Sequence, residues 1–243
     1  MEFRPTPEME LVRKSVREFA EREIKPIARE MDAAGEFPAK TVMQLGELGL
    51  LGMVAPTEYG GSGASTLEYA VAVEELARVD GSHALIVAAH NSLCTGNILV
   101  AASEEQKRKH VPALASGKTI GAWGLTEPAV GSDAAGMKTT AVREGGEWVI
   151  NGAKNFCTNA PVAGTFVITA KTDPAKGSHG ITAFIVEKGT PGLHIGKVED
   201  KLGMRGSATS QVLLEDCRVP GGNLLGKEGE GFVNALKTLD GGR

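Results

Sequence analysis

Residues 119–133 read TIGAWGLTEPAVGSD, and here the hydrophobic pattern changes from a helical to a strand period. TIGAWGLT contains β-branched and aromatic residues broken by glycine, which is typical of a strand. The ten residues GLTEPAVGSD then combine glycines, hydroxyls, a proline and two carboxylates. A hairpin needs only one or two special residues, so this loop indicates a surface that is shaped around something.

The chain before this stretch has helical spacing. A capped start at Thr6 and a stop at Gly35 enclose one predicted long amphipathic helix, whose apolar positions are Val12, Val16, Phe19, Ile24, Ile27 and Met31. The spacing of a capping box predicts two further helix starts, at Ser65 with Glu68 and at Ser103 with Gln106. SHALIVAAHNSLCTGNILVAA predicts a buried helix, because its histidines and asparagines make a poor membrane span.

The chain after residue 118 has strand character. The segments EWVING, GTFVITAK, GITAFIVEK and SQVLLEDCRV are separated by turn residues, and REGGEW predicts a hairpin. The pattern becomes helical again at FVNALKTLDGGR and stops in mid-helix, which suggests truncation. We therefore expect an α+β chain with an N-terminal all-α helical domain (1–118), an antiparallel β-barrel or sandwich-like domain (119–226) and the start of a C-terminal helical domain (227–243). This order excludes a Rossmann fold.

Composition narrows the function classes. The 243 residues carry a net charge of −4 and a pI near 5.8 without a basic run, so nucleic acid is not an expected partner. The three scattered cysteines, Cys94, Cys157 and Cys217, fit a reducing compartment, and the N-terminus has no signal-peptide pattern. We expect a cytoplasmic protein with no membrane span. His83 and His90 lack a third ligand in the sequence and are interpreted as core residues, so no metal is expected.

Four stretches, in this order, resemble the acyl-CoA dehydrogenase family, closest to its short-chain and butyryl-type members. They are GLTEPAVGSD, NGAKNFCTN at 151–159, DKLGMRGSATS with LEDCRVP, and the final LDGGR. In that family, an N-terminal helical, a middle β and a C-terminal helical domain enclose FAD, and the thioester lies against the flavin. The resemblance implies FAD as cofactor, acyl-CoA as substrate, an electron-transferring flavoprotein as partner and, at full length, a homo-oligomer, most simply a tetramer.

The resemblance also implies which residues bind. Two loops supply the flavin contacts: Trp123, Leu125, Thr126, Gly131, Ser132, Phe156, Cys157 and Thr158. Leu125 and Thr126 would bond the pyrimidine edge, Phe156 would cover the flavin face where many relatives have Trp, and Thr158 would bond near N5. The residues implied for substrate binding are Ser132, Asp240, Gly241, Gly242 and Arg243. Taken singly, Thr126 and Ser132 would be turn hydroxyls and Phe156 a core aromatic.

The implied reaction is α,β-dehydrogenation of an acyl-CoA to the trans-2-enoyl-CoA. A carboxylate removes the α-proton, and the β-hydride goes to flavin N5. Relatives place that carboxylate at one of two sites, and Gly242 stands at the second, so the catalytic base is expected beyond Arg243 and no residue of this chain is assigned as catalytic.

Other roles stay open at this stage. Glu127 and Asp133 are interpreted as structural, and Arg205 either pairs with a CoA phosphate or is solvated. Two alternative functions also remain: a flavin monooxygenase or oxidase on the same fold, and a shortened, non-catalytic protein that binds acyl-CoA.

Overall fold

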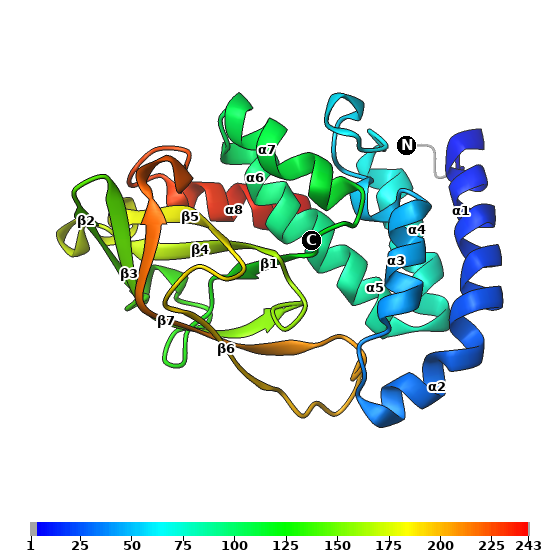
Figure 1. Cartoon of the computed structure of the whole chain (residues 1–243). Helices are drawn as coiled ribbons and strands as arrows, with labels where there is room; N and C mark the ends of the chain where they lie inside the picture. Colours follow the sequence, from blue (N-terminus) through cyan, green and yellow to red (C-terminus); the bar gives the residue numbers. More distant parts are fainter. Residues whose placement is uncertain (1–3, 243) are drawn as a thin grey trace.

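The computed structural model describes residues 4–242 and has a helical side and a sheet side (Figure 1). The helices of the described chain are α1 (Pro7–Phe19), α2 (Lys25–Ala34), α3 (Ala39–Glu47), α4 (Thr66–Val79), α5 (Gly81–Ala88), α6 (Gly96–Ala101), α7 (Glu104–Ala115) and α8 (Gly231–Gly242). The strands are β1 (Gly121–Gly124), β2 (Thr140–Glu144), β3 (Glu147–Thr158), β4 (Thr165–Lys171), β5 (Ile181–Glu187), β6 (Leu193–Val198), β7 (Thr209–Pro220) and β8 (Leu224–Leu225).

The helix ends form where local chemistry predicts them. The Thr6 hydroxyl accepts the Met9 N–H at the start of α1, and both predicted capping boxes are present at α4 and α7. The first helix passes through a π-helical segment, η1 (Ala20–Ile24), before α2 ends at Gly35, whose φ of 67° suits glycine. The predicted long helix is therefore confirmed, with one irregular turn inside it.

The apolar stretch Gly81–Ala101 is one helical run made of α5, a π-helical segment η4 (Ala89–Thr95) and α6. By length and composition it is the one described helix that meets the criteria for a membrane span, yet 56% of its most apolar window is buried inside the fold. Its polar groups find partners there: Asn91 Nδ2 donates to the carbonyls of Leu50 and Val87. This run is the central helix of the helical side.

The sheet has the strand order β6-β7-β3-β2-β4-β5-β8, with β1 paired to β4. The predicted hairpin joins β2 to β3 through Gly145, whose φ is 61°, and most pairs are antiparallel as expected. Two contacts differ from that expectation: β1 runs parallel to β4, and β2 meets β4 in parallel at Thr140 and Lys171. The sheet is thus mixed. In the sequence, the β2–β3 hairpin lies between β1 and β4, so the chain can return to run β4 parallel to β1.

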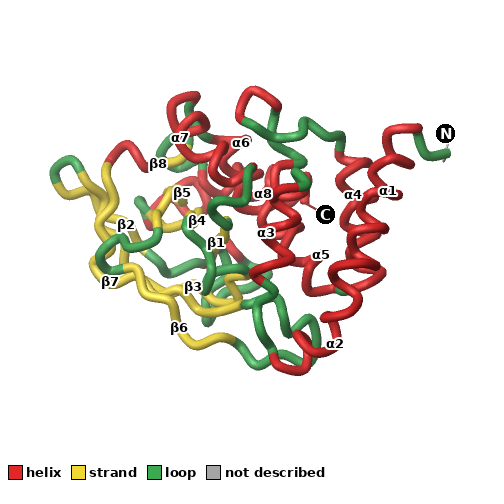
Figure 2. The backbone as a smooth tube through the Cα atoms, turned by 45° about the vertical axis from the view of Figure 1, so that its right-hand side comes forward, coloured by secondary structure: helices red, strands yellow, loops and turns green. Residues whose placement is uncertain are grey.

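The two sides share one buried layer. Besides a core within the helices and one within the sheet, a third cluster joins η4, α6 and α7 to β1, β4 and β5. Contact there is close enough that a Cβ at Gly121 would lie 2.6 Å from the Cβ of Cys94. Helix α8 packs against α6 and β5 at this junction (Figure 2). The predicted domain limits at 118 and 226 remain an interpretation.

Candidate functional site

The loop after β1 and the end of β3 meet directly, although they are distant in sequence. The Asn155 N–H donates to the Thr126 carbonyl at 2.8 Å. The ammonium of Lys154, the residue before it, donates to the Leu125 carbonyl at 3.3 Å. Within the loop, Glu127 and Val130 exchange both backbone hydrogen bonds. The two segments of the predicted flavin site are therefore held as one unit.

A buried ion pair lies beneath this unit. Lys154 Nζ is 2.7 Å from Glu127 Oε1, and the two side chains are 0% and 3% exposed. The Glu127 carboxylate also accepts the backbone N–H groups of Lys138 and Thr139. Burial raises the carboxyl pKa, but the Lys154 charge and these donors outweigh it and hold the pKa of Glu127 below its ordinary value. Removing either partner would cost roughly 3–5 kcal/mol of folding free energy, because the other charge would stay buried.

The structural interpretation of Glu127 is therefore confirmed, whereas the exposed Asp133 makes no side-chain hydrogen bond to the described residues. Lys154 was missed in the sequence, because a lysine in a strand ordinarily faces water. It points inward next to two irregularities in the β3–β7 register, one between Ile150 and Gly152 and one between Lys154 and Cys157.

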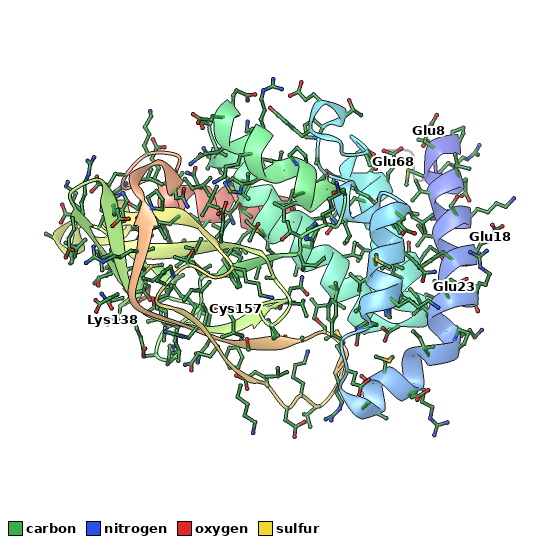
Figure 3. The ribbon with its side chains drawn as sticks, viewed as in Figure 1. Glu8, Glu18, Glu23, Glu68, Lys138 and Cys157 are labelled. Atoms are coloured by element: carbon green, nitrogen blue, oxygen red, sulfur yellow. The ribbon has the colours of Figure 1, made fainter. Side chains whose placement is uncertain are left out.

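Phe156 presents an exposed ring beside this unit. It lies at the second bulge with a φ of 55°, which is strained for a bulky residue, and it is 62% exposed. Its neighbour Cys157 is buried, and burial raises the pKa of that thiol to about 12. Figure 3 shows Cys157 on the sheet side, whereas the labelled Glu8, Glu18 and Glu23 lie along the outer helix. The Phe156 ring is thus a flat apolar face that the described chain leaves largely exposed.

Several polar groups of β1, its following loop and the end of β3 bond to nothing in the described part of the chain. The Thr126 N–H and the Thr158 hydroxyl have no partner among residues 4–242. The indole Nε1 of Trp123 is buried and likewise lacks a partner within that range. Free donors next to a flat apolar face fit a heteroaromatic ligand with carbonyls and ring nitrogens at its edge.

The exposed end of the loop tests two further expectations only in part. Gly131 and Ser132 are both exposed. A Cβ at Gly131 would meet no described atom within 4 Å, so the protein itself does not require glycine there. Two predictions remain: that Gly131 allows a ligand to approach the backbone closely, and that Ser132 contacts the flavin or CoA.

The predicted substrate helix is α8. Near its end, Gly241 lines a largely apolar hollow of about 370 Å³ together with Tyr69 and Val73 of α4 and Ala88 of α5. Asp240 is exposed, and Gly242 is the last residue of the helix. The expectation for Arg243 falls outside the described residues. An acyl-sized apolar space thus adjoins Gly241, one of the residues predicted to bind substrate.

Three other candidates have structural roles. His83 is 0% exposed and lies 2.6 Å from the Thr41 hydroxyl with Asp80 at its other ring nitrogen, and His90 is also bonded in the core. Among residues 4–242 no group of three or more His, Cys, Asp or Glu side chains is arranged to hold a metal. Arg205 bonds to Asp32, Asp200 and the Lys201 carbonyl, so it joins the β6–β7 loop to the end of α2.

Comparison with known proteins agrees with this arrangement. Two family models match: the acyl-CoA dehydrogenase N-terminal domain over residues 6–118 and the middle domain over residues 122–217. A curated relative, the short-chain specific acyl-CoA dehydrogenase of Clostridium acetobutylicum, is 53% identical over the whole chain, which covers 64% of that protein.

Two solved structures are also similar over the whole chain. The butyryl-CoA dehydrogenase of Megasphaera elsdenii has a TM-score of 0.96 at 41% identity, with 64% of its chain covered. A chain from work on the electron transferring flavoprotein of Acidaminococcus fermentans has a TM-score of 0.97 at 46% identity, again with 64% covered. The chain thus spans just under two thirds of the length of these relatives. With both family models matched in order over a fold of this similarity, the chain belongs to the acyl-CoA dehydrogenase family.

Proposed function

We propose that this chain supplies the flavin-binding half of an enzyme that dehydrogenates an acyl-CoA thioester between its α and β carbons. The observation that carries the proposal is the junction of the Leu125–Glu127 segment with Lys154–Asn155, which joins the loop that holds the unbonded Thr126 N–H to the strand segment that presents the exposed Phe156. Family membership supports the same assignment. The relatives are longer than this chain, which covers 64% of their length, so the activity is a proposal for this chain.

FAD is the proposed cofactor. A solved relative from Bacillus anthracis, 37% identical, is described as complexed with FAD. In this chain the Thr126 N–H and the Thr158 hydroxyl would bond the polar edge of the ring system, Phe156 would cover its face, and Ser132 would reach the flavin or the CoA phosphates. Bound FAD would supply the two-electron acceptor for the reaction. The chain's own contribution is to orient the ring and to keep water from one side of it.

A short acyl-CoA is the proposed substrate. The hollow of about 370 Å³ beside Gly241 is lined mainly by apolar groups, which suits an acyl chain. Asp240, Gly242 and Arg243 would then border the path of the thioester and CoA. The name of the Clostridium relative, which specifies short chains, supports this size class.

The proposed electron acceptor is an electron-transferring flavoprotein, which the Acidaminococcus match supports. We further propose a homo-oligomer, a tetramer in its simplest form, that acts in the cytoplasm. The three cysteines are free and buried, as expected in a reducing compartment.

The test of this function is binding before turnover. The purified chain is titrated with FAD, and the visible spectrum of the bound flavin is followed under argon as butyryl-CoA is added. Saturable FAD binding and a spectral shift on addition of butyryl-CoA, absent with free CoA plus butyrate, are the expected results. Binding of butyryl-CoA without any FAD would favour the non-catalytic alternative. Steady oxygen consumption with substrate would favour the oxidase or monooxygenase alternative.

A further inference from the structure

Lys154 places its ammonium beneath the proposed flavin loop, where burial lowers the pKa of the lysine and the Glu127 carboxylate opposes that shift. Its side chain is the largest in the described chain that is fully buried, and its ammonium touches the Leu125 carbonyl at 3.3 Å and Glu127 Oε1 at 2.7 Å. Its remaining close neighbour is the sulfur of Met137, at 3.9 Å. Because both side chains of the pair are buried, water does not screen the action of the ammonium on the peptide that it touches.

The dipole that the ammonium touches is the peptide between Leu125 and Thr126. Lys154 bonds the carbonyl of this peptide, and the N–H of the same peptide belongs to Thr126, which has no partner within residues 4–242. A peptide whose carbonyl accepts a charged donor is polarised, so its N–H becomes a stronger donor. The next peptide is fixed as well, because the Thr126 carbonyl accepts the Asn155 N–H. The free N–H is therefore both oriented and strengthened.

The Glu127 carboxylate and the Leu125 carbonyl both accept from the ammonium, but they differ in their other donors. The Glu127 carboxylate is bonded by the backbone N–H groups of Lys138 and Thr139 as well as by Lys154. These two backbone donors partly satisfy the carboxylate independently of Lys154. The Leu125 carbonyl receives only the ammonium.

We propose that Lys154 is a positioning residue that acts through the Leu125–Thr126 peptide and makes the Thr126 N–H a stronger donor to the electron-rich edge of a bound flavin. Reduced flavin carries more negative charge on its ring than oxidised flavin, so this donor favours the reduced form. The inference rests on the proposed function, because it assumes that the ligand of the loop is a flavin. It adds an electrostatic role to a residue that otherwise only joins two segments.

A purely structural role makes a different prediction. If the Lys154–Glu127 pair only holds the loop in place, then any folded variant that keeps the loop in place keeps the properties of the bound flavin. The variants must therefore separate stability from charge. Lys154→Arg keeps the charge, and the double variant Glu127→Gln with Lys154→Met removes both charges without leaving one of them buried and unpaired.

The experiment compares these two variants with the unaltered chain and with Glu75→Gln as a matched control. Glu75 is a second buried carboxylate in ion pairs, but it lies on α4 and pairs with Arg17 and Arg78 on the helical side. For each chain we would measure urea unfolding, the Kd for oxidised FAD, and the midpoint potential of the bound FAD by equilibration with a reference dye. The backbone N–H proton shift of Thr126 in the flavin-free chain is measured by NMR.

We expect the double variant to fold, to bind oxidised FAD several-fold more weakly, and to lose about tenfold in its preference for reduced over oxidised FAD, which is a potential lower by about 30 mV. Its Thr126 N–H proton should move upfield. Lys154→Arg should retain most of the preference, and Glu75→Gln should lose stability alone. A folded double variant with an unchanged potential and an unchanged Thr126 proton would overturn the inference and leave the proposed function standing. An unaltered chain that binds no FAD would instead remove the proposed function, and the inference with it.

Discussion

His90 accepts the backbone N–H of Gly121 at its Nδ1 atom, over 2.9 Å, and so ties the central helical run to the first strand. Its Nε2 atom lies 3.1 Å from the Leu114 carbonyl on α7. Because Nδ1 accepts a hydrogen bond, Nε2 must carry the ring proton and donate it to the Leu114 carbonyl, so the neutral imidazole joins its own helical run to β1 and α7. A second proton on the ring would break the bond to Gly121.

This geometry predicts that the chain loses stability in mild acid. Burial lowers the pKa of His90 from 6.5 to about 4. Between these values the unfolded chain binds a proton that the folded chain does not, so the free energy of unfolding falls as the pH falls, by roughly 3 kcal/mol in total. Urea unfolding at pH values from 7 down to 4.5 measures the slope. His90→Gln should be less stable at pH 7 but show a flatter profile, whereas replacing the exposed His194 should leave the slope intact; equal slopes in both variants would contradict the assignment.

Thr158→Val should weaken FAD binding without unfolding the chain. The Thr158 hydroxyl has no partner among the described residues, so its loss costs the fold little, whereas a hydrogen bond to a ligand is worth about 1 kcal/mol, or roughly fivefold in Kd. Fluorescence titration with FAD checks the affinity, and Thr190→Val, in a turn where the hydroxyl bonds the Glu187 carbonyl, serves as the control. An unaltered affinity in Thr158→Val would take this residue out of the site.

Arg205→Ala should lower stability and leave the affinity for CoA unchanged. The backbone N–H and Nε of Arg205 bond Asp32, and Nη1 bonds Asp200 and the Lys201 carbonyl, so most of its donors are engaged within the protein and we expect no role in binding a phosphate. We expect a loss of about 1–2 kcal/mol, since the Nε bond to the Asp32 carbonyl and the Nη1 bonds to Asp200 and the Lys201 carbonyl disappear, while the backbone bond to Asp32 remains. Chemical unfolding and calorimetric titration with CoA measure the two effects. Arg218→Ala, which removes only exposed ion pairs, should cost about 0.5 kcal/mol or less; a drop in CoA affinity specific to Arg205→Ala would reverse our interpretation.

The chain as it stands should not reduce its flavin with substrate. The family resemblance implies that position 242 is one of two places for a catalytic glutamate; in this chain it is glycine at the end of α8, and Asp240 lies about 200° around the helix from it. Anaerobic mixing of the FAD-loaded chain with butyryl-CoA should therefore leave the visible flavin absorbance in place. Gly242→Glu should introduce slow bleaching, and Asp240→Asn should change nothing. Bleaching by the unaltered chain would show that a base is present within these residues.

Sequence reasoning succeeded where the cause is local. The Ser65–Glu68 and Ser103–Gln106 capping boxes, the Gly35 stop and the hairpin at Gly145 depend on residues a few positions apart, and all are confirmed. The π-helical segments and the parallel pairing of β1 with β4 were not predicted, because they depend on packing between distant parts of the chain.

The candidate site shows the same division. The two flavin loops were placed together by resemblance, and their backbone contact bears out that they adjoin. Lys154 was missed for a structural reason. Alternation along a strand predicts which face of the sheet a side chain lies on only where the register is regular, and two shifts between β3 and β7 break that regularity. The roles of the individual residues toward FAD and CoA stay predictions.

The tight seat of Gly121 against Cys94 bears on how such proteins can be recombined. The family models divide the chain between residues 118 and 122, which suggests a convenient joint for swapping halves among relatives. This joint lies in the buried layer where the helical side and the sheet side pack together. The layer includes Trp123, Val167 and Ile185 of the sheet and Ile98 and Leu114 of the helices. A hybrid cut at this point would combine two surfaces that were selected against different neighbours. We expect folded chimeras in two cases. Either the two halves have matching residues in this layer, or the exchanged helical half is transferred together with the layer residues that it packs against in its own protein.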